Sequence, residues 1–237
     1  MNRHHWLLLS TALLAFAPSR NPPVRIYGAM RSFMMGGNLG AVVALDSLLP
    51  RPHLYALGVA AGLRGELLVW DRASALTQVA PGQRTTTATA AGSKAALLVA
   101  SQVPRWQALP VPAAIRTFSA LEQLVAQAAA RQGLDTTQAL PFRLSGRATA
   151  VHWHVMDWPR PAAEHTMQNH KQYAVRGRFA QQPVEVLGFY SRHHQRIFTH
   201  HDTFVHLHVR PAGQNFAAHV DSLHFAPGAA TLYLPAR

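Results

Sequence analysis

The clearest periodic segment of the chain is an amphipathic helix near its middle. Apolar residues recur at the three- and four-residue spacing of one helix face between Thr117 and Gln132. Gly133 follows directly and is expected to end the helix. The segment 117–132 is therefore predicted to be helical, and it forms a plausible seam between two halves of the chain.

The other apolar segments are short, and many alternate with polar residues, as is typical of strands. Glycine and proline residues separate these segments, and Gly62 and Gly65 mark a predicted turn at 62–65. A strand or short helix is expected at 26–35, a short helix at 40–49, and an irregular connection at 158–170. The predicted strands are 54–59, 66–70, 83–90, 94–101, 141–155 (as one strand or two), 184–190, 204–209, 219–224 and 230–234.

This order of elements predicts an α/β fold of the α+β kind, with few helices. We expect two domains built on mixed or antiparallel β-sheets. The N-terminal α/β domain is placed at 26–132 and the β-rich C-terminal domain at 133–237. A proline-rich spacer at 18–25 precedes them.

The N-terminus has the pattern of a secretory signal peptide. Arg3 opens a basic start, and a twelve-residue apolar run follows from Trp6 to Ala17. That run is too short to span a bilayer comfortably, and it ends in a small-x-small sequence typical of a cleavage site. Residues 1–17 are therefore expected to be removed near Ala17, which predicts a periplasmic or secreted protein with no membrane contact after removal.

Composition excludes several kinds of chemistry. The 237 residues include no cysteine, which rules out disulfides, thiolate metal ligands and thiol catalysis. The formal net charge of +12 could indicate nucleic-acid binding. However, Lys94 and Lys171 are the only lysines, and no basic run with interleaved aromatics occurs. We therefore expect no nucleic-acid partner.

Histidine is the unusual residue of this chain. It occurs 15 times, and eleven of the copies lie between residues 152 and 219. His206 and His208 alternate on a predicted strand and should share one face. His219 comes eleven residues later, on the next predicted strand of a hairpin. Three imidazoles on one face would make an open metal site with a free position for water or substrate.

Histidine spacing alone leaves alternatives open. Two histidines on one strand face can equally be solvent-exposed, or satisfied polar groups in a core. The pair His152 and His154 has the same spacing, and two adjacent pairs at 193–194 and 200–201 also compete. Among the few carboxylates, Glu66 follows a glycine turn and can face a pocket, while Asp221 can orient a ligand imidazole. Both can also be ordinary surface residues.

Four stretches together resemble the α-acetolactate decarboxylase family, over about residues 26–235. The most specific is the last, which carries a Val-Gly-Phe-like strand, a His-x-His and a third histidine eleven residues on. The stretches are IYGAMRSFMMGGNLG, YALGVAAGLRGELLVWD, PFRLSGRATAVHWHV and VEVLGFYSRHHQRIFTHHDTFVHLHVRPAGQNFAAHVD.

The resemblance implies a two-domain α/β protein, a homodimer, and a Zn²⁺ ion held by three histidines. By motif these ligands are His206, His208 and His219. The family's active-site glutamate, in a Gly-Glu-Leu turn, corresponds to Glu66. The implied reaction converts the small oxo acid 2-acetolactate to acetoin and CO2.

Two departures from the family pattern concern the substrate. His154 stands where the family has an arginine that faces the zinc and the substrate. We therefore expect the imidazole of His154 to have the catalytic role of holding the substrate carboxylate, without the planar fork of an arginine. The sequence also ends without the family's tail that returns a glutamate to the site. Two other functions therefore stay open: a zinc-dependent lyase or isomerase for another small 2-hydroxy-3-oxo acid, and an exported zinc- or ligand-binding protein without turnover.

Overall fold

The computed structural model describes residues 21–35, 37–159, 169 and 172–236, and in them two antiparallel sheets dominate. The predicted α+β fold with few helices is confirmed. The first sheet has, in spatial order, β1 (Val24–Tyr27), β7 (Lys94–Gln102), β3 (Leu54–Ala60), β4 (Glu66–Trp70), β5 (Ala73–Ala80) and β6 (Arg84–Ala88), with β2 (Val43–Ala44) beside β7.

The second sheet closes on itself. Its strand order is β11 (Val205–Pro211), β10 (Ala174–Tyr190), β9 (Leu140–Met156), β12 (Ala218–Pro235) and β8 (Trp106–Val111). Because β11 also pairs with β12, four of these strands form a small barrel. The closing contact is short: only His208–His219 and Val209–Ala218 are in register.

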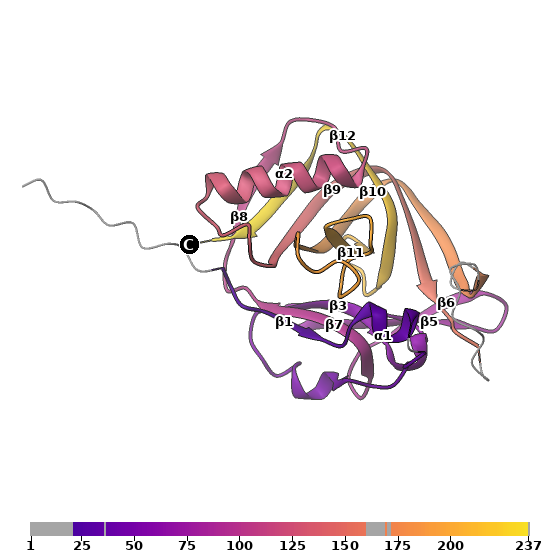
Figure 1. Cartoon of the computed structure of the whole chain (residues 1–237). Coiled ribbons are helices and arrows are strands. Elements are labelled where there is room, and N and C mark those ends of the chain that lie inside the picture. Colours follow the sequence, from indigo (N-terminus) through magenta and orange to yellow (C-terminus); the bar gives the residue numbers. More distant parts are fainter. Residues whose placement is uncertain (1–20, 36, 160–168, 170–171, 237) are drawn as a thin grey trace, which may run out of the picture.

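The helix α2 (Phe118–Arg131) covers the outer side of the second sheet, and the first sheet lies on the other side (Figure 1). The Thr117 hydroxyl caps α2 by accepting a hydrogen bond from the Ala120 amide at 3.1 Å. The buried face of α2, which includes Leu121 and Val125, packs into the core of the second sheet. The predicted helix at 117–132 is thereby confirmed.

The two sheets meet in a shared hydrophobic cluster. Leu57 and Leu97 contribute to it from the first sheet, and Leu187 and Phe189 from the second. Polar contacts reinforce the junction: the buried Thr77 hydroxyl accepts a hydrogen bond from the backbone of the β11–β12 connection at 2.9 Å. The site described below lies at this junction.

The boundary between the sheets falls earlier than the expected domain boundary at 132. β8 and α2, which lie before residue 132, belong to the second sheet and its core. β1 begins at Val24, within the expected spacer at 18–25, and Asn21 exchanges two hydrogen bonds with the backbone of Asp135. The expected signal peptide lies outside the described residues, as does most of the expected connection at 158–170.

Several secondary-structure predictions need correction. The segment 40–49 is not an α-helix but β2 followed by a 3-10 turn, η1 (Leu45–Ser47). The segment 26–35 divides into the end of β1 and a short helix, α1 (Met30–Met34), with Gly28 between them at φ +78°. β5, β8 and the first half of β10 were not predicted, and the two expected strands at 219–234 are the single strand β12, interrupted by register shifts. Another 3-10 turn, η2 (Ala61–Leu63), lies in the predicted turn region.

None of the helices in the described part of the chain is long and apolar enough to cross a membrane.

Candidate metal centre and pocket

Closure of the barrel brings three histidines together. His208 on β11 and His219 on β12 are direct cross-strand partners, and His206 lies two positions earlier on β11. Their ring centroids are 5.0 to 5.6 Å apart. One nitrogen of each ring lies within 4.8 Å of the others, so the predicted three-histidine group exists and could bind a metal ion.

Two of these imidazoles each present a buried nitrogen that has no hydrogen-bond partner in the described structure. The Nδ1 of His208 donates to the carbonyl of Leu67 at 2.9 Å, which leaves its Nε2 unpartnered. The Nδ1 of His206 is likewise buried without a partner. Buried polar atoms without partners are costly, and a metal ion would satisfy both. The residues therefore fit a metal.

The three imidazoles have the protonation state that a metal ligand needs. Burial lowers the pKa of His208 to about 3, although its hydrogen bond to the Leu67 carbonyl opposes the shift. Burial also lowers the pKa of His206 and of His219 well below the usual value. In the metal-free protein all three are thus neutral at physiological pH, with a lone pair available.

Glu66 lies beside this group, at the start of β4 in the other sheet. It is 2% exposed, accepts a hydrogen bond from the amide of Met156 at 3.3 Å, and lies 3.4 Å from the His208 Nε2. Burial raises the pKa of Glu66 well above its ordinary value, although the Met156 hydrogen bond opposes the shift. Burial thus disfavours the charged form of both partners in this contact.

A glycine fixes the direction in which Glu66 enters its strand. Gly65 adopts φ +114°, a conformation that L-residues rarely reach. A Cβ at Gly65 would also lie 2.5 Å from the carbonyl oxygen of Thr77 on β5. The Gly-Glu sequence thus lets β4 start tightly against β5 with the carboxyl directed toward the histidines.

His154 on β9 also lies at the site. It is the cross-strand neighbour of His219, and the two ring centroids are 4.7 Å apart. Its Nδ1 donates to the carboxylate of Asp221 at 2.7 Å. The structure therefore brings both predicted catalytic residues, Glu66 and His154, next to the three-histidine group, although their roles stay predictions.

Asp221 is bonded to a histidine outside the three-histidine group. The sequence left open whether it orients a ligand imidazole or is an ordinary surface residue, and in the structure it binds His154. A register shift in β12 between Val220 and Ser222 displaces it from the regular alternation. Burial raises the pKa of Asp221, but the hydrogen bond from His154 and the charge of Arg176 outweigh this, and the pKa lies below its usual value.

Arg176 is a site residue that sequence reasoning missed. It lies opposite His154 on β10, and its Nη1 donates to the second oxygen of Asp221 at 2.7 Å. The strand register thus places Arg176, His154, His219 and His208 on adjacent strands around the barrel. Arg176 thus places a permanent cation at this edge of the pocket.

The remaining histidines divide between the pocket and other roles. His200 lines the pocket with its ring centroid 5.2 Å from that of His219, and burial lowers its pKa. His152, the other half of the competing pair, is exposed and bonds the Ser222 hydroxyl. His194 bonds Ser191 and stacks on an aromatic ring. Neither His152 nor His194 belongs to the three-histidine group.

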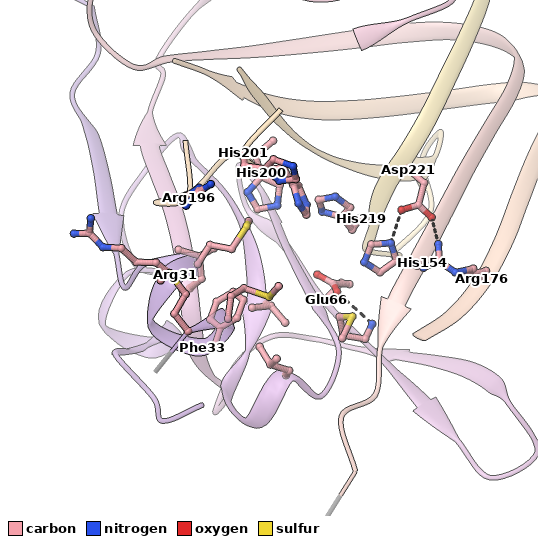
Figure 2. A pocket seen from close by; sticks show the side chains of 18 residues that line it. Arg31, Phe33, Glu66, His154, Arg176, Arg196, His200, His201, His219 and Asp221 are labelled. Atoms are coloured by element: carbon pink, nitrogen blue, oxygen red, sulfur yellow. Dashed lines mark hydrogen bonds and ion pairs between the residues drawn. The ribbon is translucent and has the colours of Figure 1, made fainter. Parts of the chain in front are cut away.

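The three-histidine group borders a pocket of about 470 Å³. Figure 2 shows Arg31 and Phe33 of the α1 region on one side of this pocket and Glu66, His154 and His219 on the other. The histidines, Glu66, Asp221 and Arg176 form a polar side. Most of the remaining lining is apolar and comes from α1, the first sheet and Met156, but Arg31 and Arg196 also line this part. A small molecule with polar and apolar ends would fit such a cavity.

A closed antiparallel barrel joined to a second sheet, with three histidines and a buried carboxyl in one pocket, defines an α+β protein able to hold a metal ion beside a small molecule. The fold is that of the α-acetolactate decarboxylases. The chain matches that enzyme of Bacillus subtilis strain 168 with a TM-score of 0.69 over 92% of this chain and 86% of the other, at 14% identity.

Two further structures agree. Acetolactate decarboxylase of Bacillus subtilis subspecies spizizenii gives a TM-score of 0.69 over 92% and 87% of the two chains, at 15% identity. A Staphylococcus aureus protein of unknown function, similar to that enzyme, gives 0.65 over 89% and 84%, at 12% identity. No family model and no curated protein sequence matches the chain. At these identities the comparisons show the fold.

Proposed function

We propose that this protein is a Zn²⁺-dependent carboxy-lyase that converts 2-acetolactate, or a related 2-hydroxy-3-oxo acid, to a hydroxyketone and CO2. The observation that carries the proposal is the position of Glu66 within 3.4 Å of a ligand histidine, in the same pocket as His154 and Arg176. This gives one cavity with metal ligands, a proton-carrying group and cationic groups for a carboxylate.

The polar edge of the pocket would orient the substrate. Arg176 and His154 share Asp221, so both are held in place before a ligand arrives. The substrate carboxylate would lie toward them, and its hydroxyl and ketone oxygens toward His206, His208 and His219. Such positioning of the reacting groups supplies a large part of the rate enhancement in many enzymes.

The chemistry needs an electron sink and a proton donor. When bound by the three histidines, Zn²⁺ supplies Lewis-acid stabilisation of charge on the substrate's oxygens. As the bond between C2 and the carboxylate breaks, its electron pair moves toward the ketone oxygen and CO2 leaves. Glu66 then gives its proton to the resulting carbanionic carbon and recovers one from water. The net change is the uptake of one proton and the release of one CO2.

A direct test measures metal content and product together. Purified protein loaded with Zn²⁺ should release CO2 from the racemic acid, and a chelator should abolish the release. Bound zinc without turnover of any oxo acid would instead favour a zinc- or ligand-binding protein.

Dimer formation and export are also proposed. Light scattering of the purified protein would test dimer formation, and cell fractionation would test export.

A further inference from the structure

The side of the pocket opposite the three-histidine group is largely apolar, although Arg31 and Arg196 also line it. Met30, Phe33 and Met34 lie at the three- and four-residue spacing of one face of α1, and all three line the cavity. Two backbone hydrogen bonds fix the helix there: the amide of Met30 donates to the Ile197 carbonyl at 2.7 Å, and the next amide donates to the Arg196 carbonyl at 2.9 Å.

Residues from both sheets complete this apolar wall. Val59 and Leu97 of the first sheet, Leu63 of η2 and Met156 of β9 line the same cavity and are 1 to 8% exposed. None of these side chains can make a strong hydrogen bond. Methionine side chains are flexible and polarisable, and they adapt to apolar groups of different shapes. We call this surface the apolar wall and define it as Met30, Phe33, Met34, Val59, Leu63, Leu97 and Met156.

The cavity is large for acetolactate, whose apolar groups are only methyls. Its volume of about 470 Å³ lies in the range of roughly 300–1,000 Å³ that is typical of sites for drug-sized ligands. A molecule small enough to touch the histidines, Glu66 and Arg176 would leave the apolar wall facing water. Covering that wall with hydrocarbon would remove apolar surface from water and strengthen binding.

We propose that the pocket selects 2-hydroxy-3-oxo acids in which one methyl of acetolactate is replaced by an alkyl chain several carbons long. The acid and oxo groups face the histidines, and the chain lies along the apolar wall toward α1. The inference rests on the proposed function for its reacting end, and on the apolar wall for its other end.

The first test measures binding without turnover. Calorimetry on the Zn²⁺-loaded protein compares the affinities of 2-hydroxy-2-methylpropanoate and 2-hydroxy-2-methylhexanoate. Both acids lack the ketone and therefore cannot be decarboxylated in the same way. Each buried methylene should tighten binding about fourfold, so the longer acid should bind about 50-fold more tightly. Equal affinity, or tighter binding of the shorter acid, would overturn the proposal.

Variants locate the chain-binding surface. Met34→Gln keeps the side-chain length but adds an amide, and it should reduce the preference for the longer acid about tenfold. Met35→Gln, at a lining residue that is 79% exposed, should reduce it less and poses little risk to folding. Val42→Gln, at an exposed residue outside the pocket lining, is the matched control and should leave the preference unchanged. If both methionine variants keep the full preference for the longer acid, the alkyl chain does not bind along α1.

Turnover separates the two proposals. With a series of 2-hydroxy-2-alkyl-3-oxobutanoates, kcat/KM for CO2 release should rise from the methyl to the butyl compound. Release that is fastest with acetolactate would reject the inference and keep the proposed function. No release from any compound, together with preferential binding of the longer hydroxy acid, would reject the proposed function and keep the apolar chain site.

Discussion

Within His208, the two ring nitrogens have different tasks. Nδ1 is held by the Leu67 carbonyl, and Nε2 is directed into the group without a hydrogen-bond partner in the described structure. This division fixes the tautomer and orients the ring before a metal arrives. The Leu67 carbonyl belongs to β4, the strand that begins with Glu66, so one strand both supports a ligand and supplies the carboxyl.

Replacing a ligand histidine should remove the metal. We expect His208→Ala to weaken Zn²⁺ binding by more than the roughly 10- to 100-fold that loss of a supporting partner costs. His152→Ala is the matched control because His152 is exposed and bonds the Ser222 hydroxyl, outside the three-histidine group. Competition with a zinc-sensitive dye measures both affinities. Unchanged affinity in His208→Ala would remove His208 from the ligand set.

Glu66 should affect turnover much more than metal binding. Glu66→Gln keeps the shape of the side chain but removes the transferable proton, so kcat should fall by about 10²- to 10⁴-fold while zinc content is retained. Glu185→Gln is the control, since Glu185 pairs with Arg210 outside the pocket lining. Nearly normal turnover in Glu66→Gln would assign proton transfer to another group.

At the scale of elements, the β11–β12 hairpin makes the site. Its two strands are in register at only two positions, and one of these is His208–His219. α2 ties down the start of β11, because the carboxylate of Glu122 accepts hydrogen bonds from the Thr203 hydroxyl at 2.6 Å and the Phe204 amide at 2.7 Å. A helix on the outside of the barrel thus holds the strand that carries two metal ligands.

Loss of this tie should weaken the fold near the site. Glu122→Ala leaves a hydroxyl and a backbone amide without their acceptor and should lower the free energy of unfolding by about 1–3 kcal/mol. Gln123→Ala, at an exposed neighbour on the same helix, is the control and should change stability by less than about 0.5 kcal/mol. Urea unfolding of the metal-free variants measures both values. Equal stability of the Glu122→Ala and Gln123→Ala proteins would show that the hydrogen bonds to Glu122 contribute little to the free energy of unfolding.

Local patterns predicted some elements well and missed others for physical reasons. The helix at 117–132 was recognisable because capping, periodicity and the following glycine agree. The first half of β10 was missed because its residues alternate between exposed and half-buried positions and carry no apolar periodicity. β8 contains Pro110 and lies at the edge of its sheet, where the ordinary strand signal is weak.

The site was predicted to the extent that its residues are close in sequence. His206, His208 and His219 lie on one hairpin, so alternation and spacing were sufficient. For Glu66 the local sequence left a pocket-facing and a surface position open, and the family resemblance favoured the site, because nothing local indicates that β4 packs against β11. Arg176 was missed because its position depends on the pairing of β10 with β9, which only the tertiary structure shows.

At the scale of the whole molecule, cations of the second sheet lie over aromatic rings of the first, Arg210 over Trp70 and Arg143 at the centre of a larger ring cluster. The guanidinium of Arg143 on β9 lies 4.4 Å from the ring centroid of Trp70 and 5.7 Å from that of Tyr55, both in the first sheet. It also lies 5.0 Å from Tyr233 and 5.3 Å from Trp106 in the second. Since the pocket lies between the sheets, their relative placement determines its geometry.

Removing the Arg143 cation should loosen the junction. Arg143→Met keeps an apolar stem but loses the interactions with the aromatic rings, and it should reduce the free energy of unfolding by about 1–2 kcal/mol. Arg147→Met, at an exposed position on the same strand, is the control. Thermal unfolding at matched protein concentration compares them. An Arg143→Met protein as stable as the control would show that burying the guanidinium costs as much as its ring contacts contribute.

The central claim is that three histidines, Glu66 and the adjoining pocket form a metal-dependent decarboxylation site. The most direct measurement determines zinc content and CO2 release from 2-hydroxy-3-oxo acids on the same sample, before and after treatment with a chelator. The account predicts one zinc per chain, release that the chelator abolishes, and recovery when Zn²⁺ is restored. Release that persists in fully metal-free protein, or protein that binds no zinc, would contradict it.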